Sequence, residues 1–85
     1  MIRKIKIVHN GQEKEYDVIF SYCSENDGKN YIVYTDYEVE NNLLKCYSAL
    51  YEDDKILPVD DIEELKSIEV VLKTLNNRYS ISKLG

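Results

Sequence analysis

The residues that could act as nucleophiles, general bases or soft metal ligands are few and far apart in this chain. His9 is the only histidine, and Cys23 and Cys46 are the only cysteines. A catalytic histidine needs a second group that orients it, and His9 stands beside the turn Asn10-Gly11 with no such neighbour. A Cys-His nucleophile would need one cysteine to meet His9, yet both cysteines are expected inside strands, with Cys23 far from that turn. We therefore expect no catalytic residue and an exposed His9.

Ligands for a metal ion or a phosphate are equally sparse. The three glycines are isolated, and no cysteine or histidine spacing matches a zinc site. Asp60, Asp61, Glu63 and Glu64 crowd the start of an expected helix, where adjacent acids splay outwards. A site for a hard cation needs a loop that folds oxygens around the ion. The sequence therefore predicts no metal, no cofactor and no enzyme, and it assigns these acids to helix capping.

Acidic residues outnumber basic ones and are concentrated in the middle of the chain. The formal net charge is −5, and residues 36–69 hold eleven acids against three lysines. Nucleic-acid affinity depends on Lys and Arg side chains that neutralise phosphate, so direct nucleic-acid binding is not expected. Glu52, Asp53 and Asp54 sit together in an expected turn. They form either a solubilising rim or an acidic docking surface for a partner.

Length and composition predict one small domain over residues 1–85. A hydrophobic fraction of 44% is enough for a folded core. A chain of this size buries only about 60% of its unfolded surface, so a second copy or a partner would add useful stability. No apolar run approaches the ~18 residues of a membrane span, and the first residues alternate charge with isoleucine, unlike a signal peptide. We expect a cytoplasmic protein with unpaired thiols.

A sustained helical period runs over residues 60–78. Apolar residues recur there at steps of three or four, which predicts one buried stripe on an amphipathic helix. The stripe comprises Ile62, Leu65, Ile68, Leu72, Leu75 and Tyr79, with Val71 beside it. Asp60 or Asp61 provides the N-cap, and Pro58 ends the preceding strand.

Four strands are expected before the helix. Ile2 to Val8 and Gln12 to Cys23 alternate and flank Asn10-Gly11, the strongest short turn signal. Tyr31 to Tyr37 forms the third strand and Leu43 to Glu52 the fourth, after which residues 56–59 lead into the helix. The predicted fold class is α+β: a four-stranded antiparallel β-meander with one C-terminal amphipathic helix packed across one face.

Turn geometry and charge together fix the register of the first hairpin. If Asn10-Gly11 is a two-residue type I′ turn, the paired positions sum to 21 and opposite charges face each other across the strands. The expected pairs are Lys4 with Asp17, Lys6 with Glu15, Ile5 with Tyr16 and Ile2 with Ile19. In the next hairpin, Tyr22 pairs with Tyr31 and Phe20 with Val33.

These registers assign each strand residue to one face of the sheet. The helix-covered side is expected to hold Tyr16, Val18, Phe20, Tyr22, Tyr31, Val33, Thr35, Tyr37, Tyr47, Ala49 and Tyr51. If the fourth strand keeps this phase, the far side exposes Ile2, Ile19, Ile32, Tyr34, Leu44, Cys46 and Leu50. Monomers rarely leave such a patch bare, so Ile19, Ile32, Tyr34, Leu44 and Leu50 form a candidate partner surface. Two alternatives stay open: segment 38–44 folds back over the patch, or the fourth strand is out of phase.

Three stretches of the chain also resemble a known family. They are EYDVIFSY after a short turn, KNYIVYT, and CYSALYEDDKILPVDDIEELKSIEVVL. Over roughly residues 6–75 they resemble the short acidic bacterial proteins grouped as domain-of-unknown-function family 1292. This chain is less acidic than that pattern and has Leu65 where an aromatic residue often sits. The family has no established activity, and its members are often encoded beside a nuclease that resembles Holliday-junction resolvases. The resemblance therefore implies a fold and a bacterial cytosolic setting, but no mechanism.

Two classes of function follow. The first is a non-catalytic protein-interaction module or accessory factor, which binds a protein partner or a second copy through the uncovered sheet face. The second is an acidic regulator or inhibitor of a basic nucleic-acid-handling protein, such as a nuclease or a ribosome-associated factor. Eight tyrosines also suggest an RNA-binding sheet, but such sheets surround their aromatic residues with Lys and Arg.

Overall fold

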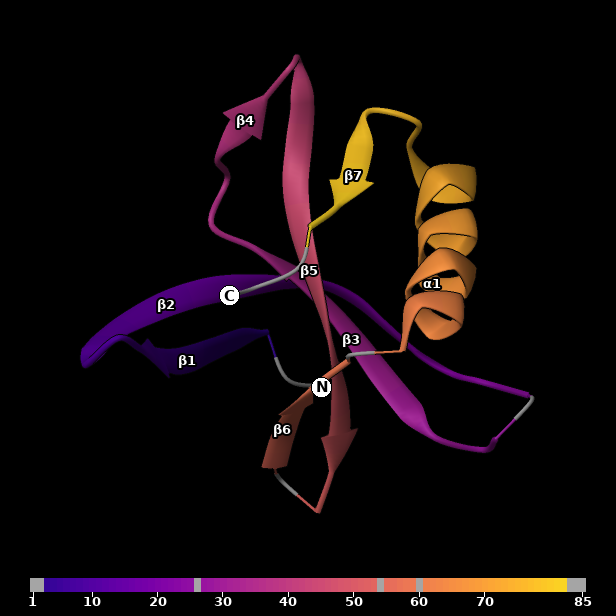
Figure 1. The fold of residues 1–85 in the computed structure, drawn as a ribbon, viewed down its shortest axis with the longest axis horizontal. Coiled ribbons are helices and arrows are strands. Elements are labelled where there is room, and N and C mark those ends of the chain that lie inside the picture. The colour runs from indigo at the N-terminus through magenta and orange to yellow at the C-terminus, as the bar shows by residue number, and fades with distance from the viewer. Residues whose placement is uncertain (1–2, 26, 54, 60, 83–85) are drawn as a thin grey trace.

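The computed structural model describes residues 3–25, 27–53, 55–59 and 61–82. It is an α+β fold, as expected, in which an antiparallel sheet packs against one C-terminal helix (Figure 1). The sheet contains seven strands in the described residues, and the prediction of four was wrong. The elements are β1 (Lys4–His9), β2 (Gln12–Cys23), β3 (Asn30–Thr35), β4 (Val39–Glu40), β5 (Leu43–Glu52), β6 (Lys55–Pro58), α1 (Ile62–Leu75) and β7 (Tyr79–Ile81).

The first hairpin has the register that its turn and charges predict. Lys4 pairs with Asp17, Ile5 with Tyr16 and Lys6 with Glu15. Asn10 and Gly11 both have positive φ, 52° and 76°, as a type I′ turn requires. Ion pairs cross the hairpin surface, from Lys4 Nζ to Glu15 Oε1 at 3.4 Å and from Lys6 Nζ to Glu13 Oε1 at 3.7 Å. The expected pair of Ile2 with Ile19 lies outside the described residues.

β5 is the strand on which the rest of the sheet is assembled. β3 and β6 both pair with Ala49 and Leu50, so they lie on opposite edges of β5. β4 and β7 both pair with Leu44 and likewise occupy opposite edges. The predicted bounds of β5 are correct, but β6 was expected as a connector. Tyr79, expected on the helix, opens β7, which runs parallel to β5 (Figure 1).

The helix is shorter than its apolar period suggests. Asp61 is the N-cap, and its Oδ1 accepts a hydrogen bond from the Glu63 amide at 3.0 Å. The helix ends at Leu75, because Asn76 adopts extended backbone and its side chain accepts the Arg78 amide at 2.9 Å. Of the predicted stripe, Ile68 and Leu72 are buried, Leu65 and Val71 are half-buried, and Ile62 and Leu75 are exposed.

A β-bulge between Val18 and Phe20 divides the apolar residues of β2 between two cores. Before the bulge, Tyr16 and Val18 belong to the far-face core, whose buried members are Ile5, Tyr16, Ile32, Tyr34, Tyr47 and Ala49. After it, Phe20 and Tyr22 pack on the helix-face core, whose buried members are Tyr31, Val33, Cys46, Ile68 and Leu72. An extra residue in a strand reverses the side on which the following side chains project. The expectation that Tyr16, Val18, Phe20 and Tyr22 share one face was therefore wrong for the first two.

The phase of β5 is the reverse of the one expected. Tyr47, Ala49 and Tyr51 belong to the far-face core, whereas Leu44, Cys46 and Leu50 pack on the helix side. The pairing of β5 with β3 sets this phase, because Ile32 pairs with Ala49 and Tyr34 with Tyr47, and paired residues project to the same face. The β4–β5 turn, Asn41-Asn42, where both residues have positive φ, 54° and 63°, joins β4 to β5. The alternative of an out-of-phase fourth strand is the correct one.

The end of β3 also departs from the expected alternation. Thr35 is buried, and its hydroxyl donates to the Lys45 carbonyl at 2.7 Å and accepts from the Tyr37 amide at 3.0 Å. Tyr37, expected on the helix side, is 62% exposed and has a φ of 67°. Its hydroxyl donates to Asp17 at 2.8 Å, which ties the β3–β4 connection to β2.

The sheet curls so that its far face is covered by its own strands. β1 and the first half of β2 lie on the side of β5 opposite to α1 (Figure 1), and they contribute Ile5 and Tyr16 to the far-face core. Tyr16 packs edge-to-face on Tyr34, with ring centroids 5.1 Å apart, and Tyr47 completes the aromatic group. Ile32 is 1% exposed and Tyr34 is 2% exposed. The expectation of an uncovered apolar face was therefore wrong.

Leu72→Ala tests whether the helix-face core holds α1 against the sheet. Leu72 is fully buried, so its truncation should lower the free energy of unfolding by about 2–5 kcal/mol. Leu75→Ala is the matched control, because Leu75 lies on the same stripe but is 61% exposed, and its truncation should cost about 0.5 kcal/mol or less. Urea denaturation followed by circular dichroism measures both. Equal losses would show that the whole stripe carries the contact.

Ile32→Lys tests the closure of the far-face core. A buried ammonium without a partner is costly, so we expect the variant to lose about 3 kcal/mol or more of stability, or to unfold. Val8→Lys is the control, because Val8 is a strand residue that is 69% exposed. Thermal denaturation distinguishes the two variants. An Ile32→Lys protein as stable as the Val8→Lys protein would show that water reaches the far face.

Candidate functional site

The predicted apolar partner surface is not assembled. Ile32 and Tyr34 are buried in the far-face core. Ile19, Leu44 and Leu50 are half-buried and pack on the helix-face core, on the other side of the sheet. The structure therefore separates these five residues between two interiors.

The cysteines are unpaired, and burial distinguishes them. Cys23 is exposed at the end of β2, whereas Cys46 is fully buried beneath the helix. Burial raises the pKa of the Cys46 thiol to about 11, which keeps it protonated and unreactive at neutral pH. The side chain of His9 lies outside what the structure describes. No group of three His, Cys, Asp or Glu residues in the described chain could hold a metal ion.

A thiol titration tests this difference. In the native protein a disulfide reagent should modify Cys23 within minutes and leave Cys46 intact, because only a thiolate that the reagent can reach reacts. In 6 M guanidinium, about two thiols per chain should react, as both side chains become solvated. Release of the coloured thiolate measures the stoichiometry, and Cys23→Ser provides the background. Rapid modification of native Cys23→Ser protein would show that the helix-face core opens readily.

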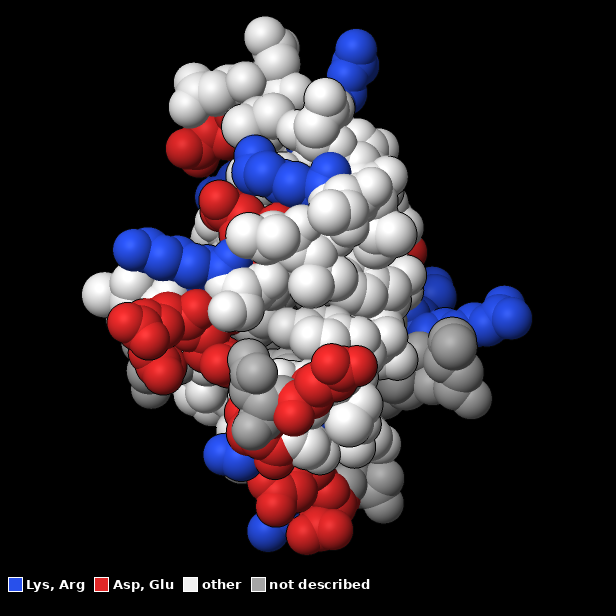
Figure 2. Space-filling view, turned by 90° about the vertical axis from the view of Figure 1, so that its right-hand side faces the viewer, with Lys and Arg blue, Asp and Glu red and all other residues white. Residues whose placement is uncertain are grey.

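Carboxylates gather at one end of the molecule, which we call the acidic end. Three segments contribute to it, and all lie in the lower half of Figure 1: the β2–β3 turn, the β5–β6 turn and the start of α1. Its described acidic residues are Glu25, Asp27, Glu52, Asp53, Asp61, Glu63 and Glu64. Asp54, which the sequence placed in the docking turn, and Asp60 lie outside the described residues. Figure 2, which looks onto the α1 side, shows carboxylates crowded in the lower half of that face.

The acidic end differs from the rest of the surface in its ion pairing. At the other end, four lysines pair with six acids: Lys4, Lys6, Lys14 and Lys45 with Glu13, Glu15, Asp17, Asp36, Glu38 and Glu40. Lys14, which lies over the ring of Tyr16, is paired with the nearly buried Asp36. None of the seven carboxylates of the acidic end forms an ion pair with a described lysine or arginine. Lys29 acts on this group at longer range, because its charge also lowers the pKa of Asp27.

Tyr31 connects the acidic end to the helix-face core. Asp27 accepts hydrogen bonds from the Lys29 amide at 2.9 Å and from the Tyr31 hydroxyl at 2.8 Å, and the Lys29 amide holds the pKa of Asp27 below its usual value. Burial raises the pKa of Tyr31, and Glu64 and Asp27 raise it further. Burial also raises the pKa of Tyr22 to about 12, again with help from Glu64 and Asp27. Asp27 is thus fixed in its ionised form, and the negative charge reaches the edge of the core.

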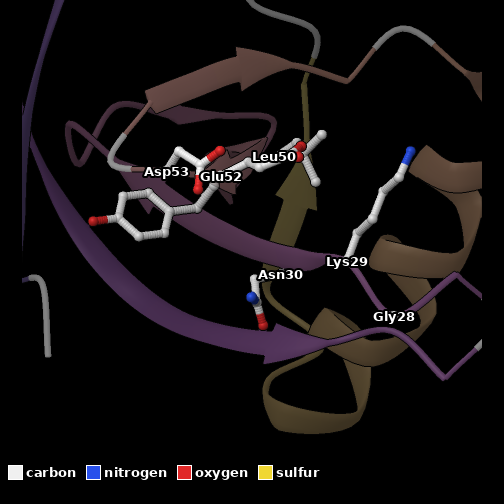
Figure 3. Close-up of a pocket in the computed structure, with 7 residues that line it drawn as sticks. Gly28, Lys29, Asn30, Leu50, Glu52 and Asp53 are labelled. Carbon is white, nitrogen blue, oxygen red and sulfur yellow. The ribbon is translucent and has the colours of Figure 1, made fainter.

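Two cavities open at the acidic end. The larger, of about 350 Å³, lies between the β2–β3 turn and the end of β5 (Figure 3). The smaller, of about 200 Å³, lies beside the start of α1. Both are lined by Lys29 and Leu50, so they adjoin. Together they form one groove, whose lining includes Glu52 and Asp53 in the larger cavity and Asp27, Asp61 and Glu64 in the smaller.

Sequence reasoning found part of this site. It singled out Glu52 and Asp53 and assigned Glu64 to helix capping, but it gave no role to Asp27 or Lys29. The registers carry the missing signal, because Tyr22 pairs with Tyr31 and Tyr31 pairs with Leu50. These two pairings place the β2–β3 turn beside the end of β5.

Comparisons with known proteins add no assignment. No family model matches the chain, and no curated protein or solved structure is significantly similar to it. The resemblance to domain-of-unknown-function family 1292 therefore stays a prediction. No helix in the described part of the chain is long and apolar enough to cross a membrane.

Proposed function

We propose that this protein is a non-catalytic interaction module whose acidic end binds a basic protein partner. The observation that carries the proposal is the uneven pairing of its charges. Four lysines form ion pairs with six acids at one end of the molecule, whereas the seven described carboxylates of the acidic end form no ion pair with a described lysine or arginine. A surface kept negative in this way favours association with a positive surface and disfavours neutral or acidic ones.

The more specific form of this proposal is an acidic regulator of a protein that handles nucleic acid. Such a partner presents lysines and arginines to phosphate groups, and the carboxylates of the acidic end would occupy the positions of those phosphates. The net charge of −5 supports this role, because a chain of that charge does not compete for nucleic acid itself. The setting that we propose is the bacterial cytosol, where a reducing environment suits two unpaired thiols.

The double variant Glu52→Gln, Asp53→Asn tests the proposal. Both residues are exposed, so stability should change by about 0.5 kcal/mol or less. Tagged protein should lose its partner from a native extract when these two charges are removed. It should also release the partner at high salt, because exposed charge pairs are screened. Quantitative mass spectrometry of the eluted proteins measures the loss.

The matched control is Glu13→Gln, Glu15→Gln, which makes the same change in net charge at the other end. It should retain the partner, because those two acids already lie close to Lys4 and Lys6. If both double variants lose the partner equally, only overall charge matters and the acidic end is not a site. A partner that stays bound in high salt to the wild type and to both double variants would contradict the proposal altogether.

A further inference from the structure

The larger cavity at the acidic end exists because two strands part. The ladder between β3 and β5 ends at Tyr31 with Leu50, although each strand continues beyond this pair. β3 begins one residue earlier, where Asn30 pairs with β2, and β5 runs on to Glu52, which pairs with β6. Figure 3 shows Lys29 and Asn30 on one side of the opening and Glu52 and Asp53 on the other. The space between them is therefore bounded by backbone on both sides.

Three apolar residues contribute to the lining of the groove. Leu50 lines both cavities, and Pro58 and Val59 line the smaller one beside it. Leu50 and Val59 are half-buried and pack on the helix-face core, and Pro58 is exposed. Gly28, on the wall of the larger cavity, has open space where a Cβ would lie. The groove thus has an apolar floor in Leu50, Pro58 and Val59, of which Leu50 and Val59 pack on the helix-face core.

Negative charge lies at both ends of this floor. Glu52 and Asp53 line the larger cavity, and Asp27, Asp61 and Glu64 line the smaller one. Lys29 is the one cationic side chain in the described lining, and it reaches from the β3 side toward α1 (Figure 3). Five carboxylates against one ammonium leave the groove strongly negative. The positive end of the helix dipole offsets only about half a charge near Asp61.

An inorganic cation does not suit this arrangement. A calcium ion takes six to eight oxygens that converge on one point, whereas these carboxylates stand at the two ends of an apolar floor. Lysine and arginine side chains suit it better, because they bury an aliphatic stem on apolar surface and keep the charged head at its edge. An extended chain also directs alternate side chains to one face, so that one apolar and two basic side chains can reach the groove together.

We propose that this groove binds an extended segment of the basic partner, with an apolar side chain packed on Leu50 and a lysine or arginine side chain at each end. One basic side chain reaches Glu52 and Asp53, and the other reaches Asp61 and Glu64. This proposal rests on the proposed function and adds the form of the ligand to it. The chemistry recognised is a basic, apolar, basic pattern at alternate positions of the segment.

The probe is a blocked peptide, Arg-Ser-Val-Ser-Arg, which places the three recognised side chains on one face of an extended chain. Titration into isotope-labelled protein, followed through amide chemical shifts, should perturb residues 28–30, 50–53 and 58–64. Glu52→Gln and Glu64→Gln should each weaken binding about 3-fold, the size of one exposed ion pair. A peptide with serine in place of valine should bind about 5-fold more weakly, because the apolar contact is lost. Glu13→Gln should leave the affinity unchanged.

Two results would overturn the groove. The first is equal affinity for the serine peptide, or for a peptide in which citrulline replaces both arginines. The groove would then not distinguish the apolar or the basic side chains. The second is chemical-shift change spread over the β1–β2 hairpin. Neither result decides the proposed function, which is tested separately by the loss of the partner from extract when Glu52 and Asp53 are changed. If the peptide binds as expected but the double variant Glu52→Gln, Asp53→Asn retains the partner from extract, the groove binds peptide and the proposed function is wrong.

Discussion

The β-bulge between Val18 and Phe20 is the constraint on which the rest of the structure depends. A single sheet of this size has two faces to cover and only one helix to cover them. The bulge lets β2 serve both faces, with Tyr16 in the far-face core and Phe20 on the helix-face core. The first hairpin can then curl over the far face while the second half of β2 stays beneath the helix. Two small cores therefore share one set of strands, with no second helix in the described chain.

Sequence patterns predicted the features that depend on residues close together in the chain, such as the first hairpin and the bounds of β5. The Asn10-Gly11 turn and the crossed charges of Lys4 and Asp17 fixed the first hairpin, and alternation fixed the bounds of β5. The face to which each strand residue projects depends on β-bulges and strand registers, which composition does not predict. Ile19 gives no sign that it is the extra residue of a bulge, and one such residue reverses every later assignment on its strand. Asn41-Asn42 did carry a usable signal, since adjacent asparagines tolerate the positive φ of a type I′ turn.

The candidate site shows the same division. Glu52 and Asp53 stand out in the sequence because they are adjacent acids in a turn. Asp27 and Glu64 are far from them in the chain and meet them only through the pairing of β2 with β3, of β3 with β5, and of the helix with the sheet. The sequence did not predict the local charge balance either. No pattern indicated that Lys14 and Lys45 would form ion pairs with Asp36, Glu38 and Glu40.

The pairing of lysines at one end has a consequence at long range. Four lysines offset part of the charge of six acids at the ion-paired end, so the field within a Debye length, about 8 Å at physiological salt, is more negative at the acidic end. The negative charge of the molecule is therefore uneven, and it is greater at the acidic end. A positively charged body approaching in solution would rotate the domain before contact, turning the groove beside Leu50 toward it. For the proposed basic partner, lower salt should therefore raise the association rate more than it lowers the dissociation rate.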